Sequence, residues 1–281
     1  MKIRKTVSLL LIVIMLFSCF SICSLAAGKR YVVLGDSIAY GSGLVNARDA
    51  CYGKMVADTC GFNYVNHAVP GATTWEFVDE LDSKIIRSDL AKADIVSISI
   101  GGNDFLNNLS RLMFDAIVKK DYAEFDALAE GAYTNIKKVI KLIKGLNSDV
   151  VIMLQTLYNP QFGYLKDAYQ QGADRINEVI YRCAFEYPDN VVVVDVASVL
   201  NGDESNFADD TMHPSAKGNE LIAKEVLRTL NWLGLTKKTK LSTDTFGVDV
   251  ILGPTVSKTL DYYAFFLHAF AKALGAIFTV V

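Results

Sequence analysis

Short apolar runs alternate with longer segments of helical periodicity along the chain. Runs rich in Val, Ile and Leu predict five strands, at residues 31–34, 64–66, 95–100, 150–154 and 191–194. Between the strands, apolar residues recur every three or four positions, as they do in helices that pack one face on a core. This alternation predicts an α/β fold in which helices cover a parallel sheet.

The longest interval between predicted strands, residues 104–147, ends in an amphipathic helical pattern. Its apolar positions share one stripe, while four lysines occupy the other faces, which favours a helix packed on the sheet over a binding patch. The stripe consists of Ala132, Ile136, Val139, Ile140 and Ile143. Further helices are predicted at residues 165–187 and from Pro214 to Leu233, with Gly234 beyond the end. We expect one domain at residues 28–235.

The first 27 residues have the pattern of a secretory signal peptide. Lys2, Arg4 and Lys5 precede an apolar run over residues 7–25, and small residues follow at positions 26 and 27. We therefore predict a secreted, extracellular protein, with attachment to a membrane or cell surface left open. An uncleaved anchor is the main alternative, because the run approaches the ~20 residues that a span needs. A lipoprotein signal ending at Cys19 is disfavoured by the bulky Phe17.

Two segments of opposite character follow the predicted domain. Residues 236–259 are polar and turn-rich, and they indicate a linker or a wrapped extension. Residues 260–281 are strongly apolar, and Asp261, His268 and Lys272 form one narrow polar stripe, which predicts a hydrophobic, amphipathic C-terminal helix. Such a helix docks on the body of the predicted domain or on a second copy, or binds a membrane surface; a true span is the least favoured alternative.

Charge and cysteine content restrict the function and the bonding. Removing the signal deletes three cations and no anions, so the net charge of the 281-residue chain moves from −3 to −6, which argues against a nucleic-acid partner. Cys51, Cys60 and Cys183 remain. A helix between the first two would hold their Cα atoms roughly 13 Å apart, too far for a disulfide, so we expect none unless that segment is a loop.

A serine stands at the end of the first predicted strand. Ser37 follows Gly35 and Asp36, at the carboxyl edge of the sheet, where open α/β folds bind ligands. A serine hydroxyl is a weak nucleophile until a neighbouring base takes its proton. Ser37 is thus a candidate catalytic nucleophile that requires a base.

The chain has 3 histidines, so the search for that base is short. His213 lies three residues after Asp210, whose carboxylate can accept the Nδ1 proton of the imidazole and aim Nε2 at the serine. Such a pair alone is weak evidence, because surface turns contain it by chance. His67 is better explained as a structural group, and His268 belongs to the polar stripe of the C-terminal helix.

Acyl transfer also needs donors for the oxygen that becomes negative. Three successive predicted strands are followed by suitable groups: the backbone N–H of Ser37, the backbone N–H of Gly71, and the side-chain amide of Asn103. Each alone is compatible with a simple tight turn. Their common position at one edge of the sheet favours an oxyanion hole.

These blocks together resemble the GDSL, or SGNH, serine hydrolases. The match falls on Ser37, Gly71, Asn103 and His213, in the order in which that family carries its four naming residues, and it covers about residues 30–233. Ile38 replaces the Leu that often follows the serine in the family, a swap of similar volume. The resemblance implies a flavodoxin-like three-layer α/β/α sandwich with a five-stranded parallel sheet, without the Gly-x-Ser-x-Gly elbow of α/β-hydrolases.

The resemblance implies an esterase or acylhydrolase with a triad of Ser37, Asp210 and His213 and with Ser37, Gly71 and Asn103 as the oxyanion hole. It permits a lipid ester or an acetylated carbohydrate as substrate, and it requires no cofactor and no metal. The long insert after Asn103 and residues 158–164 are expected to line the pocket. Two alternatives remain: a non-catalytic surface module that binds glycan or lipid, and an acyltransferase that uses the same triad.

Overall fold

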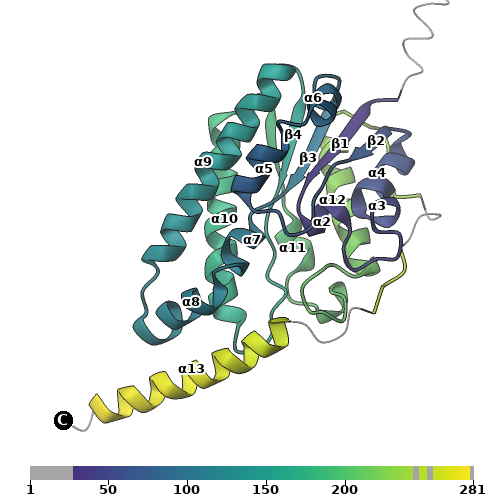
Figure 1. The fold of residues 1–281 in the computed structure, drawn as a ribbon. Coiled ribbons are helices and arrows are strands. Elements are labelled where there is room, and N and C mark those ends of the chain that lie inside the picture. Colours follow the sequence, from purple (N-terminus) through teal and green to yellow (C-terminus); the bar gives the residue numbers. More distant parts are fainter. Residues whose placement is uncertain (1–27, 243–246, 252–255, 279–281) are drawn as a thin grey trace, which may run out of the picture.

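A computed structural model of the chain describes residues 28–242, 247–251 and 256–278. Five strands form one all-parallel sheet in the order β2-β1-β3-β4-β5, which lies between the helices in Figure 1. The strands are β1 (Arg30–Gly35), β2 (Asn63–Asn66), β3 (Ile95–Ser99), β4 (Val151–Gln155) and β5 (Val191–Val194). The predicted α/β sandwich is confirmed, and its strand order is that of flavodoxin-like folds.

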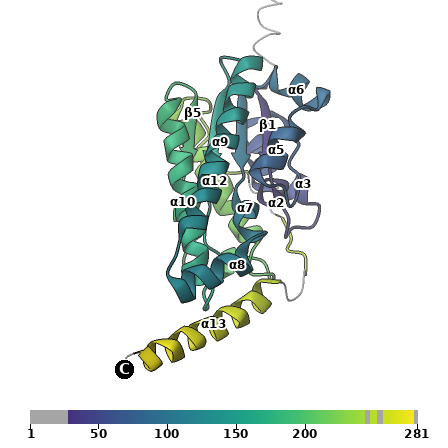
Figure 2. The ribbon, with the colours of Figure 1, turned by 60° about the vertical axis from the view of Figure 1, so that its left-hand side comes forward.

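Side chains alternate between the two faces of the sheet and fill two cores. In β1, Val32 and Leu34 enter one core, whereas Tyr31 and Val33 enter the other. The first core packs against α5 (Thr74–Glu80), α6 (Lys84–Leu90), α9 (Ala123–Leu146) and α10 (Lys166–Glu186). The second packs against α4 (Tyr52–Cys60), α11 (Val196–Leu200) and α12 (Ala216–Trp232). Figures 1 and 2 show helices on both sides of the sheet.

The predicted stripe of α9 is buried in full, from Ala132 to Ile143, so the sequence periodicity identified its packed face correctly. Of the lysines on its other faces, Lys138 and Lys141 are exposed, whereas Lys137 is half-buried and pairs with Glu186 of α10 at 2.6 Å. The insert before α9 forms α7 (Gly102–Leu106), α8 (Leu109–Phe114) and one π-helical turn, η1 (Asp115–Lys119). It extends from the carboxyl edge of the sheet, beside the site described below.

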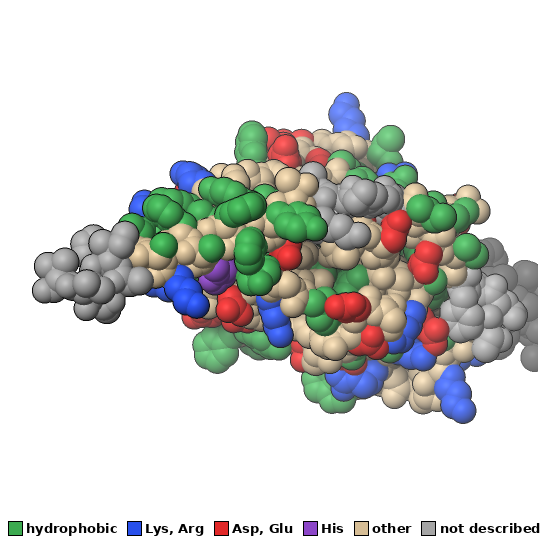
Figure 3. All heavy atoms as spheres, turned by 90° about the horizontal axis from the view of Figure 1, so that it is seen from below, with side chains coloured by type: hydrophobic (Ala, Val, Ile, Leu, Met, Phe, Trp, Pro, Cys, Tyr) green, Lys and Arg blue, Asp and Glu red, His purple; other side chains and the backbone are tan. Residues whose placement is uncertain are grey.

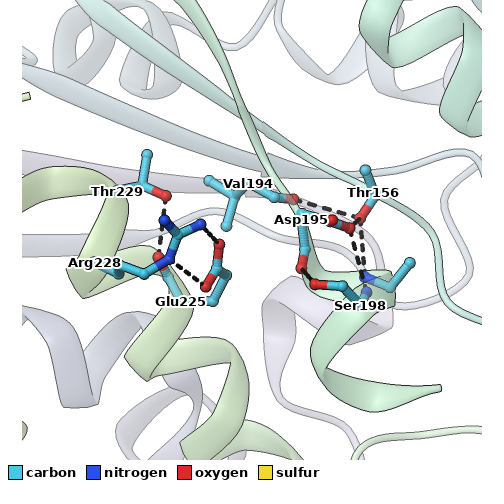
Figure 4. A network of polar contacts seen from close by, with 8 residues as sticks. Thr156, Val194, Asp195, Ser198, Glu225, Arg228 and Thr229 are labelled. Atoms are coloured by element: carbon cyan, nitrogen blue, oxygen red, sulfur yellow. Dashed lines mark hydrogen bonds and ion pairs between the residues drawn. The ribbon is translucent and has the colours of Figure 1, made fainter. Parts of the chain in front are cut away.

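Polar contacts connect the start of α11 to the residue that follows β4 (Figure 4). The Thr156 hydroxyl accepts a hydrogen bond from Ala197 N–H at 2.9 Å and donates to Asp195 at 3.2 Å. Asp195 also caps α11 by accepting from Ser198 N–H at 3.2 Å. These bonds satisfy backbone donors of the first helical turn, which have no partner within the helix.

Short helices complete the carboxyl edge of the sheet. They are α2 (Ser37–Tyr40), α3 (Ala47–Ala50) and the 3-10 turn η2 (Glu204–Asn206). Cys51, Cys60 and Cys183 are free. The helix α4 lies between the first two, as the expectation of no disulfide required. The signal-peptide prediction, with Cys19, falls on residues 1–27, outside the described residues.

The helix α13 (Val256–Phe278) begins four residues earlier than position 260, within the segment assigned to the linker. Ala264 and Leu267 are buried against Met113, Ile117 and Leu165 in a small third core. Among the described residues, no helix is both long and apolar enough to cross a lipid bilayer. The helix lies along the lower edge of the molecule in Figures 1 and 2.

Candidate active site

The turn after β1 carries Ser37 out of the sheet. Gly35 has φ +126°, and a Cβ atom at this position would lie 1.9 Å from the Ser99 backbone oxygen, so only glycine fits. Asp36 then caps α2, and its carboxylate accepts from Ile38 N–H at 3.0 Å. Ser37 is the first residue of α2, and it remains partly exposed while its neighbours are buried.

The carboxyl group of Asp36 is buried beneath this turn. Burial raises its pKa to about 7, and the hydrogen bond from Ile38 and the nearby charge of His213 oppose the rise only in part. Asp36 is therefore largely protonated up to neutral pH. It is a structural acid behind the serine, with a hydrogen-bonding role that the sequence did not predict.

His213 lies on a short hairpin before α12. Phe207 pairs with Pro214 across this hairpin, and Ala208 N–H donates to the His213 carbonyl at 2.8 Å. Thr211 bends the chain with φ +57°. This bend returns the imidazole to Asp210, whose Oδ2 lies 2.5 Å from His213 Nδ1.

Asp210 is only 2% exposed, and it accepts hydrogen bonds from the backbone of this hairpin. Its Oδ1 accepts from Met212 N–H at 2.9 Å and from His213 N–H at 3.0 Å. Burial alone would raise the pKa of Asp210, but the bonds from His213 and the backbone outweigh it and lower the pKa. An ionised Asp210 thus accepts a hydrogen bond from Nδ1–H of His213. The imidazole proton is then on Nδ1, and Nε2 is the nitrogen that can take a proton.

The two further oxyanion candidates lie on neighbouring loops. Gly71 has φ +87°, and no described group accepts its N–H or that of Ser37. Asn103 Nδ2 donates to the Ala72 carbonyl at 2.9 Å. An amide nitrogen carries two hydrogens, so one remains for a ligand.

A carboxylate that sequence reasoning missed ties these two loops together. Asp104 accepts from Thr74 N–H at 2.9 Å and from the Thr74 hydroxyl at 2.6 Å. Asp104 follows Asn103, and Thr74 lies three residues after Gly71, so the bonds hold both oxyanion candidates in register. The only signal in the sequence was the Asp next to Asn103, and it did not reveal the partner.

One cavity of about 340 Å³ brings the predicted residues together. Ser37, Gly71, Asn103 and His213 line it, and Asp210 lies behind His213. Its remaining wall is mostly apolar and includes Ile38, Pro70, Leu106, Leu157, Tyr158, Tyr169 and Met212. Within the described chain no hydrogen bond joins Ser37 to His213, a separation common in sites without substrate. Both segments expected to line the pocket contribute, through Leu106 and Tyr158.

The other two histidines lie elsewhere. His67 Nε2 lies 2.7 Å from Asp89, which also pairs with Arg30, so His67 is a satisfied structural group. His268 lies on α13 beside the ring of Tyr164. Across the described ranges, no group of three or more His, Cys, Asp or Glu side chains is arranged to hold a metal ion.

The match to a protein family decides what this site belongs to. The model of the GDSL-like lipase/acylhydrolase family matches residues 33–221, which include the second half of β1, the other four strands and every residue named above as lining the cavity. The chain belongs to this family. It is a lipase or esterase of the GDSL type that hydrolyses ester bonds, and its ester substrates follow from that membership.

Similar proteins extend the comparison. YpmR of Bacillus subtilis (strain 168), named as uncharacterized, is 25% identical over 266 residues, covering 85% of this chain and all of YpmR. The spore germination lipase LipC of Bacillus licheniformis is 25% identical over 210 residues, covering 70% of this chain and 94% of LipC. The crystal structure of the lipase Lip_vut3, from a goat rumen metagenome, shares the fold with TM-score 0.61 and 21% identity, covering 70% of this chain and 95% of that one.

Proposed function

We propose that this GDSL hydrolase cleaves carboxylic esters through an acyl-enzyme on Ser37. His213 Nε2 takes the hydroxyl proton as Ser37 Oγ attacks the carbonyl carbon, and the carbonyl electron pair moves onto its oxygen. The N–H groups of Ser37 and Gly71 and the Asn103 amide donate to that oxyanion. Its collapse breaks the ester bond, and His213 returns the proton to the departing alcohol.

Water then releases the acyl group. His213 takes a proton from the water as its oxygen attacks the acyl carbon, and the second oxyanion collapses to expel Ser37 Oγ, which regains the proton. Asp210 orients the imidazole and stabilises its charged form. The observation that carries the proposal is the 2.5 Å contact between buried Asp210 and His213, which lines the same cavity as Ser37.

Hydrolysis of p-nitrophenyl acetate and labelling by a fluorophosphonate test the mechanism. We expect Ser37→Ala to lose both, while Ser110→Ala, an exposed serine on α8, keeps both. Turnover by Ser37→Ala at the wild-type rate would exclude Ser37 as nucleophile. A folded wild type that is neither labelled nor active would instead favour a non-catalytic binding module. Transfer of the acyl group to an added alcohol in preference to water would identify an acyltransferase.

The shape of the cavity favours an aliphatic acyl group over an acetylated sugar. Leu106, Leu157 and Tyr169 line the cavity and also an adjoining apolar crevice between α7, α9 and α10. The free volume of this crevice is about 10 Å³, so an acyl chain enters it only when the lining side chains move. The crevice continues past Phe105, Leu109, Phe125, Ala168 and Ala173. An apolar surface of this kind binds hydrocarbon by excluding water and offers few partners to hydroxyl groups.

A series of p-nitrophenyl esters from acetate to decanoate tests this preference. We expect kcat/KM to rise with chain length, and Leu157→Trp to reduce octanoate cleavage about tenfold relative to acetate by filling the crevice mouth. Trp232→Leu, at an exposed site on α12, is the control. A wild-type enzyme that cleaves acetate alone would point to deacetylation of carbohydrate.

We further propose that the protein is secreted and that α13 binds it to a lipid surface, where it acts. The N-terminal segment has the pattern of a signal peptide. Figure 3 shows hydrophobic side chains on the surface of the molecule seen from below, and the exposed large hydrophobic residues of α13 are aromatic. These are Tyr262, Tyr263, Phe265, Phe266 and Phe270. Rings of this kind favour the boundary between lipid and water.

Flotation with lipid vesicles tests the surface role. Tyr262→Ser combined with Phe266→Ser, at side chains 71% and 65% exposed, is expected to abolish flotation without changing p-nitrophenyl acetate turnover. Phe185→Ser, at an 86% exposed residue on α10, is the matched control. Flotation that survives the double change excludes this face, and a concentration-dependent dimer that the double change dissociates indicates self-association instead.

A further inference from the structure

A short segment beyond the family match joins the two loops of the site. The backbone of residues 247–251 runs antiparallel to the loop after α2, with Leu44 opposite Asp249. Val45 N–H donates to the Val248 carbonyl at 2.8 Å, and Val250 N–H donates to the Gly43 carbonyl at 2.9 Å. The segment thereby adds a strand-like cover to the chain that follows Ser37.

The same segment reaches the histidine side of the site through one side chain. Asp249 Oδ1 accepts from Ala216 N–H at 2.6 Å. Ala216 is the first residue of α12 and lies three residues after His213. An N–H at this position has no acceptor within its helix, and a negative charge is favourable there. Asp249 therefore binds the end of the His213 hairpin directly.

The two joined loops also touch each other. A Cβ atom at Gly43 would lie 3.1 Å from the Pro214 carbonyl oxygen and 3.2 Å from His213 Cβ, and Gly43 has φ +102°. The adjacent Ser42 N–H donates to the Ser37 carbonyl at 2.9 Å. A shift of the loop at residue 43 is thus transmitted to the nucleophile on one side and to the histidine on the other.

We propose that residues 247–251 form a clamp that fixes the distance between Ser37 and His213, and that Asp249 is its positioning residue. The inference rests on the catalytic roles proposed above for Ser37 and His213. A misplacement of about 1 Å can cost as much as 100-fold in rate, so even weak bonds that hold these loops matter for turnover. Val248 and Ile251 are largely exposed, so the clamp buries little apolar surface and contributes more to alignment than to stability.

Kinetics of full-length variants on p-nitrophenyl acetate test the clamp. We expect Asp249→Ala to lower kcat about tenfold with KM within about twofold, because alignment and not substrate binding is disturbed. Labelling of Ser37 by a fluorophosphonate slows in proportion. Asp249→Asn, which keeps an acceptor oxygen, recovers most of kcat, and Val250→Pro, which removes the N–H donor to Gly43, repeats the loss. Val248→Ala is the matched control, because its exposed side chain is not part of the pairing.

The outcomes separate the clamp from the mechanism. Wild-type kcat in both Asp249→Ala and Val250→Pro overturns the clamp. Equal loss in the Asn and Ala variants, together with a lower thermal midpoint, also overturns it and leaves a purely structural role. The Ser37→Ala variant is measured in parallel. If it remains active, the proposed mechanism is wrong, and the effect of Asp249→Ala then concerns a reaction that does not use Ser37.

Discussion

Replacement of Asp210 by asparagine isolates the role of one proton. In the wild type, Oδ1 of Asp210 accepts two backbone N–H groups, from Met212 and His213, and Oδ2 faces His213 Nδ1. The amide oxygen of asparagine must keep the two backbone donors, because an NH₂ group there would face N–H groups. The NH₂ group then faces Nδ1, which must become an acceptor.

That exchange places the remaining imidazole proton on Nε2. Nε2 can then no longer take the hydroxyl proton of Ser37 during the attack. The base is lost although packing and hydrogen-bond number are retained. A wrong tautomer of this kind lowers kcat by about 10⁴-fold, or about 5.4 kcal/mol in activation free energy. We expect that loss with KM and thermal midpoint close to wild type.

The assay is p-nitrophenyl acetate hydrolysis at pH 7, with enough enzyme to measure a 10⁵-fold reduction. Asp209→Asn is the matched control, since it makes the same charge change at the adjacent, exposed position. An Asp210→Asn protein within tenfold of wild type would refute the assignment of Asp210 as the orienting carboxylate. A large fall in thermal midpoint would show instead that the hairpin had lost its fold.

Two further predictions concern the neighbouring groups. Asn103→Ala removes one proposed oxyanion donor and should lower kcat by about 10²–10³-fold with little change in KM. Asn107→Ala, at the exposed end of α7, should leave kcat unchanged. Equal effects of the two substitutions on kcat would exclude a specific role for Asn103. Burial raises the pKa of Asp36 to about 7. The unfolded chain therefore loses this proton from about pH 4, whereas the folded chain keeps it until about pH 7. The free energy of unfolding falls across that interval. Asp36→Asn removes the titration, so its thermal midpoint should exceed that of wild type more at pH 8 than at pH 4, and an equal difference at both pH values would contradict the assignment.

The sheet was the most predictable part of the fold. The run at 150–154 is apolar on both faces because β4 is a central parallel strand that is buried on both sides. Each predicted strand lies within one or two residues of an observed one. The periodicity also identified the buried face of α9. The order of the strands was not predicted, since apolar patterning does not state which strands are neighbours, and the family resemblance implied only a flavodoxin-like sandwich.

The candidate site could be predicted where its residues follow strand ends. Ser37, Gly71 and Asn103 come after β1, β2 and β3, and parallel topology brings those ends to one edge. The Asp104–Thr74 bonds were missed, because their partners lie 30 residues apart and neither residue type is unusual in a loop. The bond from the Tyr158 hydroxyl to the Met212 carbonyl, which spans 54 residues, was missed for the same reason.

The polar segment after the domain shows the limit of side-chain patterns most clearly. Residues 236–259 were compatible with a linker or with a wrapped extension, and the described part at 247–251 is wrapped. Its attachment is made by backbone N–H and carbonyl groups, which every residue except proline carries in full, so no composition signals it. The side chain of Asp249 connects the segment to the first residue of α12 by accepting from Ala216 N–H. Part of the alignment of Ser37 and His213 is therefore supplied by residues outside the range that defines the family, and related chains that lack such an extension must hold these two loops by other contacts.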